Sequence, residues 1–496
     1  MNAISRTTRR FTATLTPLLA ALVLAGCAST VEPPANPDHA LPVTAAAFKE
    51  GGARFTTVAP AEQQDRGAWW LTFNDPVLND LVTRAGARNT SIQEAAARLA
   101  QARALVRNTE ADRSLQVGLG AGAERGAGAN TPQGNRPTSI FSAGANLSYE
   151  LDLFGRLSKT TDAARLDAQS RDALLQSTRL LVQAQTAQTY LTLRALDDER
   201  ALVRQTVEAY RDTLSLTQRR FNAGDVAELD VARVQSEVAS NESEALALDR
   251  SRAELEHALA VLVGESASGF TLSVAPWQSA LPRVPAGVPG TVLARRPDVA
   301  AAQTAMQAAQ ARVGIARTAW FPDVTLTGSG GFASTDLGDL FKWSARSWGI
   351  GALLSLPIFD GGRREANVQG AAAQLDAAMA SYRGQVLGAF KDVEDQLSAL
   401  RLLDDQSEAQ GRAVQAASRA TVLSERRYRN GLVSQIELLD ARRSELRNRR
   451  QELQVKSAQY QATVGLIRAL GGGWDAPAVV GDVAPAADAQ RSVAAR

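Results

Sequence analysis

Acidic side chains follow a glycine turn at two places in the chain, and these acids are the residues best suited to bind or repel charge. The first place reads RRFNAGDVAELDVAR (219–233) and the second reads RRYRNGLVSQIELLDAR (426–442). In the second copy Ile436 and Asp440 are four residues apart and Glu437 and Asp440 are three apart, so all three share one face of a helix. Taken alone, such an acidic pair usually lies on a solvated helix face.

Residues that could carry catalysis or bind a metal are few. The chain has two histidines, His39 and His257, and one cysteine, Cys27, so it cannot form a Cys/His metal cluster. It contains no G-x-S-x-G motif and no phosphate-binding loop, and Gly471-Gly472-Gly473 lacks the lysine and hydroxyl residue that such a loop needs. We therefore expect a protein that is not an enzyme, with no cofactor and no metal site.

Charge and hydropathy further limit the classes of protein to which the chain can belong. The 54 basic and 52 acidic residues give a net charge of +2 and are distributed along the chain, so there is no concentrated basic face and we expect no nucleic-acid partner. The hydrophobic fraction of 45% is ample for a large core. No stretch of about 18 apolar residues exists beyond the amino terminus, so we expect no transmembrane helix in the mature chain. A soluble, a surface-anchored and a β-barrel protein all remain possible at this point.

The first 26 residues predict a signal peptide. Basic residues precede an apolar run over 11–25, which is the pattern of a secretory signal and is too short to span a membrane. Leu24-Ala25-Gly26-Cys27 resembles a bacterial lipobox, in which Cys27 is lipidated and becomes the new amino terminus, and Ala28 after it implies outer-membrane sorting in bacterial lipoproteins. The proline-rich stretch 27–65 is typical of a tether. An ordinary signal peptide with an incidental cysteine is the alternative.

The rest of the chain is two copies of one unit. Gly224 and Gly431 are 207 positions apart, and the same offset aligns Gly155-Arg156 with Gly362-Arg363. We predict a first repeat over 66–263 and a second over 297–472. The segment between them, 264–296, is predicted to hold a short strand or two, and the tail 473–496 is predicted to be disordered.

Each repeat is predicted to contain a β-hairpin followed by a long helical hairpin. Apolar residues alternate with polar or small ones over four segments of about ten residues, and the predicted strands are about 115–128, 139–153, 323–334 and 346–359. Aromatic residues gather on or beside these strands, as in the girdles of membrane barrels. A water-facing antiparallel sheet with aromatic core positions is the alternative.

The helical hairpins contain no proline in their long arms. Runs of helix formers cover 156–221 and 363–428, and the chain turns at Gly224 and Gly431, where a glycine can end a helix in a left-handed conformation. Apolar residues lie on more than one face of each run, which indicates side-by-side coiled-coil packing of several helices.

The number of strands predicts an oligomer. Four strands cannot close a barrel, because the smallest membrane barrels need about eight. An open sheet edge is not tolerated in hydrocarbon, where its backbone groups find no partner. If the hairpins lie in a membrane, several copies must share one barrel, and three copies would supply twelve strands.

Four segments carry a resemblance to a known family, together with the two glycine turns and the repeat: WWLTFNDPVLNDLVTRA (69–85), RRPDVAAAQ (295–303), ARTAWFPDVTLTGSGG (316–331) and LLSLPIFDGGRR (353–364). With these the chain resembles the TolC/OprM-type outer membrane efflux proteins, in their lipoprotein branch, over essentially everything after the tether. This resemblance implies an α+β membrane protein that forms a homotrimer, with a twelve-stranded β-barrel in the outer membrane continuous with a periplasmic α-barrel. It also implies a passive exit duct that works with a periplasmic adaptor protein and an inner-membrane RND-type pump.

The resemblance also assigns roles near the two turns. It places Ile436, Glu437 and Asp440 at a gate that closes the periplasmic end, and it makes Tyr428 and Asp230 candidates for a latch that holds neighbouring coils together. Some members carry an arginine five residues after the tyrosine, but this chain has a valine, Val433. A latch must therefore use other partners, and Arg233 is a candidate because the repeat aligns it with Asp440.

Two other functions fit the same residues. A duct for type I protein secretion would share the architecture, and the lipobox weakly favours solute efflux over it. A lipid-anchored periplasmic coiled-coil scaffold with a soluble sheet belongs to a different class. The transported substrate is not encoded in these features, because the pump selects it.

Overall fold

The computed structural model describes residues 48–50, 67–127, 137–282, 284 and 295–472. The predicted signal peptide 1–26, the lipidation site Cys27 and the predicted tail 473–496 lie outside the described residues, as does most of the tether. The short described piece of the tether contacts a helix, since the backbone amide of Lys49 donates to Glu394 Oε1 at 2.7 Å.

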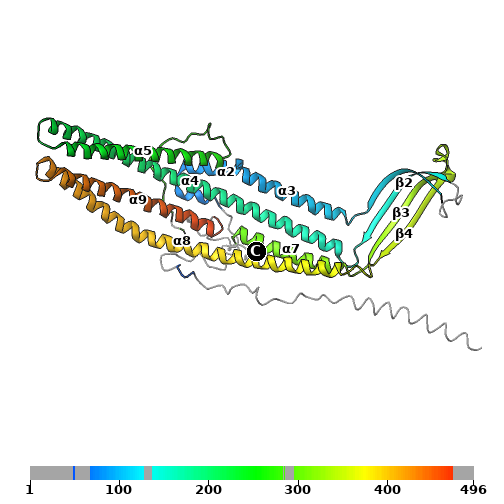
Figure 1. Ribbon diagram of the computed structural model, residues 1–496. Helices are drawn as coiled ribbons and strands as arrows, with labels where there is room; N and C mark the ends of the chain where they lie inside the picture. The colour runs from blue at the N-terminus through cyan, green and yellow to red at the C-terminus, as the bar shows by residue number, and fades with distance from the viewer. Residues whose placement is uncertain (1–47, 51–66, 128–136, 283, 285–294, 473–496) are drawn as a thin grey trace, which may run out of the picture. The chain divides into compact units, whose positions relative to one another are not determined.

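The order of elements repeats once along the chain (Figure 1). The first half contains η3 (Trp69–Phe73), α2 (Pro76–Arg88), α3 (Thr90–Ala111), β1 (Gln116–Gly126), β2 (Thr138–Leu151), α4 (Arg156–Asn222) and α5 (Glu228–Leu262). The second half contains α7 (Pro297–Thr318), β3 (Asp323–Ser334), η4 (Leu337–Asp339), η5 (Trp343–Ala345), β4 (Arg346–Ser355), α8 (Arg363–Arg429) and α9 (Gln435–Ala469). The long helices α4 and α8 each have 67 residues, and α5 and α9 each have 35. The predicted duplication is therefore present in the fold.

The four strands form one antiparallel sheet in the order β1-β2-β3-β4. Residues directly opposite one another share a face, and the register places Val117, Leu147, Gly328 and Ile350 in one row. This face is apolar and open, with Ile350 86% exposed. The next row, on the opposite face, contains Gly118, Asn146, Ser329 and Gly349. The predicted alternation is therefore confirmed, and β1 and β4 are the two edge strands.

Three strands end earlier than predicted, and the first is β1, which ends at Gly126 rather than at 128. β4 ends at Ser355 rather than at 359, because Pro357 has no amide hydrogen to continue a ladder. β2 ends at Leu151 rather than at 153, because the Asp152 carboxylate turns to cap the next helix and accepts from the amides of Leu157 at 3.0 Å and Ser158 at 2.7 Å. These amide hydrogen bonds, with that of the Ser158 hydroxyl, hold the pKa of Asp152 below its usual value although burial opposes them.

Aromatic side chains gather at both ends of the sheet. Phe332 meets Phe341 edge to face at 5.8 Å between ring centroids, beside the connection from β3 to β4. Phe154 stacks on Phe321 at 4.7 Å, where the strands join the helices. Trp348, on the apolar face of β4, is 76% exposed.

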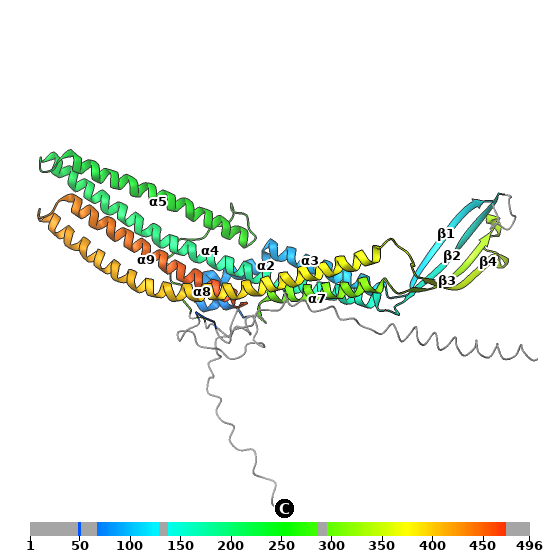
Figure 2. The same cartoon turned by 60° about the horizontal axis from the view of Figure 1, so that its bottom comes forward.

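The long helices pack as two hairpins, α4 with α5 and α8 with α9 (Figures 1 and 2). Each begins directly after a β-hairpin, so the sheet lies at the amino ends of α4 and α8 and the glycine turns lie at their carboxyl ends. Gly224 and Gly431 have φ values of 81° and 71°, and their amides donate to the carbonyls of Phe221 and Tyr428. The two predicted turns are therefore confirmed as left-handed helix ends.

The largest core lies midway along α4, where η3, α2, α5 and α9 meet it. Phe73, Leu191 and Leu466 are almost fully buried there, and Trp277 packs on Tyr460 at 4.5 Å between ring centroids. The described part of the segment between the repeats, residues 264–282, 284 and 295–296, forms no strand, and the rest of the predicted segment lies outside the described residues. This segment is held by side chains instead of a ladder, because Trp277 enters the core and the Arg194 and Arg252 guanidiniums donate to carbonyls of the segment.

Candidate functional site

The acids predicted to form a gate lie together near the tip of α9. Ile436 and Asp440 are exposed, at 45% and 63%, and Glu437 is also exposed. Leu438 and Leu439, on the other side of the helix, are buried. No other described residue buries these three side chains, and their role in a gate stays a prediction.

The gate acids have arginine neighbours in the same helical hairpin. Asp440 Oδ1 lies 3.3 Å from Arg443 Nη1, and Glu437 Oε1 lies 3.8 Å from Arg427 Nη1. These pairs are solvated, and pairs of this kind are worth about 0–1 kcal/mol each. They fix the acids only weakly.

Of the latch candidates, Asp230 and Arg233 pair with one another within the chain. Arg233 Nη1 lies 3.5 Å from Asp230 Oδ1, one helical turn away. Tyr428 is buried, its hydroxyl has no hydrogen-bond partner among the described residues, and the Arg220 guanidinium lies 5.5 Å from its ring centroid. Asp440 contacts Arg443 rather than Arg233, so a pair between Arg233 and Asp440 across the coils stays a prediction.

A set of side chains that the sequence reading missed joins α9 to the first helical hairpin. We call it the α9 seam, and it comprises Gln435, Leu439, Arg442, Arg443 and Arg450. These residues recur along α9 at spacings that place side chains on one side of a helix. The only signal in the sequence was the density of arginine in α9, which by itself indicates a solvated helix.

The end of the seam next to the Gly431 turn contacts apolar and uncharged residues of the first helical hairpin. Leu439 packs against Tyr210, Val234 and Val238. Gln435 Nε2 donates to Thr217 Oγ1 of α4 at 3.1 Å. Burial raises the pKa of Tyr210 to about 12, so its phenol stays neutral at physiological pH.

The middle of the seam uses arginines. Arg442 Nη1 donates to Thr213 Oγ1 at 2.6 Å and to the Ala209 carbonyl at 3.1 Å, both on α4. Arg443 donates to Glu237 of α5, and this hydrogen bond raises the pKa of the guanidinium. Two turns further along α9, Arg450 binds two acids of the first hairpin, and the distances are 2.7 Å to Glu199 Oε1 and 2.6 Å to Glu244 Oε1.

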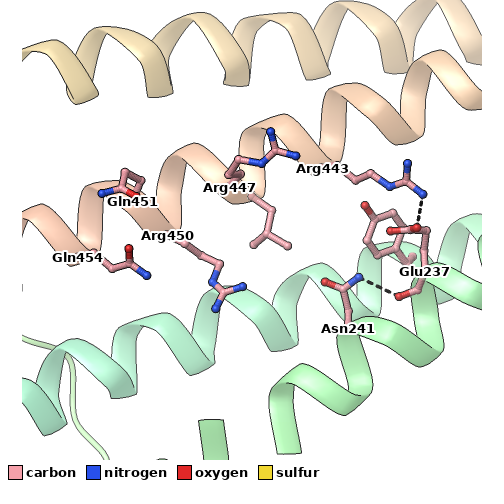
Figure 3. A pocket seen from close by; sticks show the side chains of 9 residues that line it. Glu237, Asn241, Arg443, Arg447, Arg450, Gln451 and Gln454 are labelled. Carbon is pink, nitrogen blue, oxygen red and sulfur yellow. Dashed lines mark hydrogen bonds and ion pairs between the residues drawn. The ribbon is translucent and has the colours of Figure 1, made fainter. Parts of the chain in front are cut away.

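A polar pocket of about 370 Å³ lies beside the seam, between α4, α5 and α9 (Figure 3). Glu237 and Asn241 line it from α5, and Arg443, Arg447 and Arg450 line it from α9. Asn241 Nδ2 donates to the Glu237 carbonyl at 2.8 Å, which fixes the α5 wall. Leu446 and Tyr210 also line the pocket, so charged and apolar side chains both face it.

Among the described residues, no three His, Cys, Asp or Glu side chains are grouped so that they could hold a metal ion. Within the same residues, every helix is either too short or too polar to cross a membrane.

A sheet with one open apolar face, joined to paired helical hairpins with charged tips, fits the class of outer membrane channels. The model of the family described as outer membrane efflux protein matches residues 81–265 and 288–472, and the chain belongs to this family. Two matched segments correspond to the two halves of the fold. The chain is therefore an outer membrane protein of an efflux system.

Known relatives cover nearly the whole chain. Outer membrane protein OprJ of Pseudomonas aeruginosa is 33% identical over 466 residues, which are 92% of this chain and 95% of OprJ. The cation efflux system protein CusC of Escherichia coli O6:H1 is 29% identical over 464 residues, 93% of this chain and 98% of CusC. The crystal structure of the CmeC outer membrane channel of Campylobacter jejuni superposes with a TM-score of 0.82 at 25% identity, covering 90% of this chain and 94% of CmeC.

Proposed function

We propose that the chain forms the homotrimeric outer membrane channel of a tripartite efflux pump, through which drugs or other small solutes leave the cell passively. The observation that carries this proposal is the four-stranded sheet with two unpaired edges and one open apolar face. In hydrocarbon, unpaired strand edges are not tolerated. Pairing β4 of one copy with β1 of the next continues the antiparallel order, and three copies close a twelve-stranded barrel.

In this trimer the helices extend the barrel into the periplasm. The tips of the α8–α9 hairpins bring three copies of Ile436, Glu437 and Asp440 around one axis. Rings of carboxylates bind cations and an apolar ring resists wetting, while crowded like charges raise one another's proton affinity. The channel opens when the α8–α9 hairpin moves about the Gly431 turn.

A passive channel has no energy source of its own, so it needs partner proteins that supply energy and solute. An RND-type pump of the inner membrane supplies the energy and selects the solute, and a periplasmic adaptor protein joins the pump to the helical tips. Lipidated Cys27 anchors the amino terminus in the outer membrane. The type I secretion duct remains the second candidate, because it shares this architecture.

The proposal can be tested by measuring assembly and conductance of the channel. Outer membranes run unheated on a gel are expected to give a trimer band that disappears on heating, and the purified trimer is expected to conduct ions in a planar bilayer. A protein that is released from the membrane once its lipid is removed, and that conducts nothing, would be the periplasmic scaffold instead.

The Asp440→Ala substitution is expected to raise single-channel conductance or to reduce the preference for cations. The reason is that it removes three carboxylates from one ring at the constriction. Reversal potentials in a KCl gradient measure the selectivity directly. Asp225→Ala, at the turn of the first hairpin, is the matched control and should leave both quantities unchanged. Wild-type conductance and selectivity in the Asp440 variant would place Asp440 away from the constriction.

A further inference from the structure

The predicted gate residues Ile436, Glu437 and Asp440 lie in the first turns of α9, near the tip of the α8–α9 hairpin. The α9 seam joins α9 to α4 and α5 of the same chain. Its contacts begin at Gln435, directly after the turn, and continue to Arg450. The seam therefore lies on the same helix as the gate residues but on the side that faces the first hairpin.

Arg443 has a special place in the seam because it binds acids on both hairpins. One side of its guanidinium contacts Asp440, which is a predicted gate residue, and the other contacts Glu237 of α5. The chain of charges Asp440–Arg443–Glu237 thus connects the gate to the first hairpin. A displacement of α9 away from α5 must break the link to Glu237.

Two of the three partner acids are largely buried, which makes their links stronger than ordinary surface pairs, whereas the Glu244 side chain is 41% exposed. The Glu237 side chain is only 13% exposed and that of Glu199 only 12%. An acid that loses its arginine in such surroundings is left poorly solvated, and that loss is far more unfavourable than the loss of a solvated pair. By contrast, Arg211 and Glu242, which pair within the first hairpin, are 51% and 40% exposed.

We propose that Arg443 is the residue that positions the gate, with Arg450 repeating its link two helical turns further along α9. The pairs of these arginines with Glu237, Glu199 and Glu244 hold the α8–α9 hairpin against the first hairpin of its own chain and keep the channel shut. Opening requires these pairs to separate. This inference rests on the proposed function and specifies how the gate is controlled.

The test is a charge-reversal cycle in the full-length trimer. Arg443→Glu places a third acid beside Glu237 and Asp440, and Glu237→Arg places a second arginine beside Arg443. Each single variant is expected to increase the open-to-closed ratio in planar bilayers on the order of tenfold, as for a coupling of ordinary size. The double variant restores the opposite charges and is expected to return the ratio to within about threefold of wild type.

Two further variants control the cycle. Arg211→Glu breaks an exposed pair within the first hairpin and is expected to leave the ratio unchanged. Arg443→Gln removes the charge without adding repulsion and provides a folded variant if Arg443→Glu yields no heat-sensitive trimer; it is expected to give an intermediate increase. An unchanged ratio in Arg443→Gln, or a double variant no closer to wild type than the single variants, overturns the proposal. Absence of any conductance in the wild type would instead overturn the proposed function.

Discussion

Replacing Ile350 with arginine is expected to abolish the assembled trimer, whereas replacing Ser329 with arginine is expected to leave it intact. The two residues lie at neighbouring rows of the sheet, since Ile350 pairs with Gly328 and Ser329 pairs with Gly349. They belong to opposite faces, because successive side chains of a strand alternate. The two substitutions therefore lie at nearly the same depth in the membrane and differ only in the face of the sheet that carries them.

The expected size of the effect comes from the lipid. Arginine on the lipid face of a barrel costs about 2–4 kcal/mol near the middle of the bilayer, and Ile350 lies in the middle of β4. The symmetry of a trimer repeats this cost in each copy. An arginine at 329 enters the row that contains Asn146 and two glycines, where a polar lumen accepts it.

The measurement is the fraction of protein that runs as a heat-sensitive trimer in unheated outer membranes. We expect almost none for Ile350→Arg and a wild-type fraction for Ser329→Arg. Equal assembly of both variants would mean that the apolar face does not meet lipid, as in the scaffold alternative.

Much of the fold could be predicted because its determinants are local. Alternation with a period of two revealed all four strands, and Gly224 and Gly431 marked the ends of the long helices to within about a residue. The strand ends at Leu151 and Ser355 were less predictable, since a capping carboxylate and a proline decide them. Both lie in segments whose apolar alternation continues past the last ladder hydrogen bond.

The candidate site was only half predictable, for a physical reason. The spacing of Ile436, Glu437 and Asp440 on one helical face follows from the sequence, and their exposure agrees with it. The α9 seam depends on contacts such as Arg443 with Glu237, which are 206 positions apart. An arginine that pairs across such a distance has the same local pattern as one that points into water.

The same limitation applies to a buried carboxylate in the core. Asp197 lies in RALDDER (194–200), a stretch that reads as an exposed helix face. In the structure Asp197 is 3% exposed and binds three arginines, with distances of 3.1 Å from Arg194, 3.2 Å from Arg200 and 2.8 Å from Arg252. Because its neighbours in sequence are polar, the sequence does not reveal that Asp197 joins two helices, α4 and α5.

Replacing Asp197 with alanine is expected to destabilise the protein by about 3–5 kcal/mol, because it leaves buried arginines without their shared counter-ion. The loss extends to the segment between the repeats. Arg194 Nη1 also donates to the Ser273 carbonyl at 2.8 Å, and Arg252 Nη2 donates to the Leu272 carbonyl at 2.5 Å. Without Asp197 the Arg194 guanidinium loses the carboxylate that orients it toward the Ser273 carbonyl. Arg252 keeps its second partner, Glu256, at 2.8 Å.

Hydrogen exchange of the purified trimer can locate this loss. Asp197→Ala should speed amide exchange in the middle of α4 and in the matching part of α5, and it should lower the temperature at which the trimer dissociates. Glu242→Ala is the control, because its exposed pair with Arg211 is worth no more than about 1 kcal/mol. If the two variants lose the same stability, water must reach the three arginines, and Asp197 does not organise the core. If Asp197→Ala alone unfolds this region while the tip of α9 keeps its protection, the core and the gate are separate units of stability.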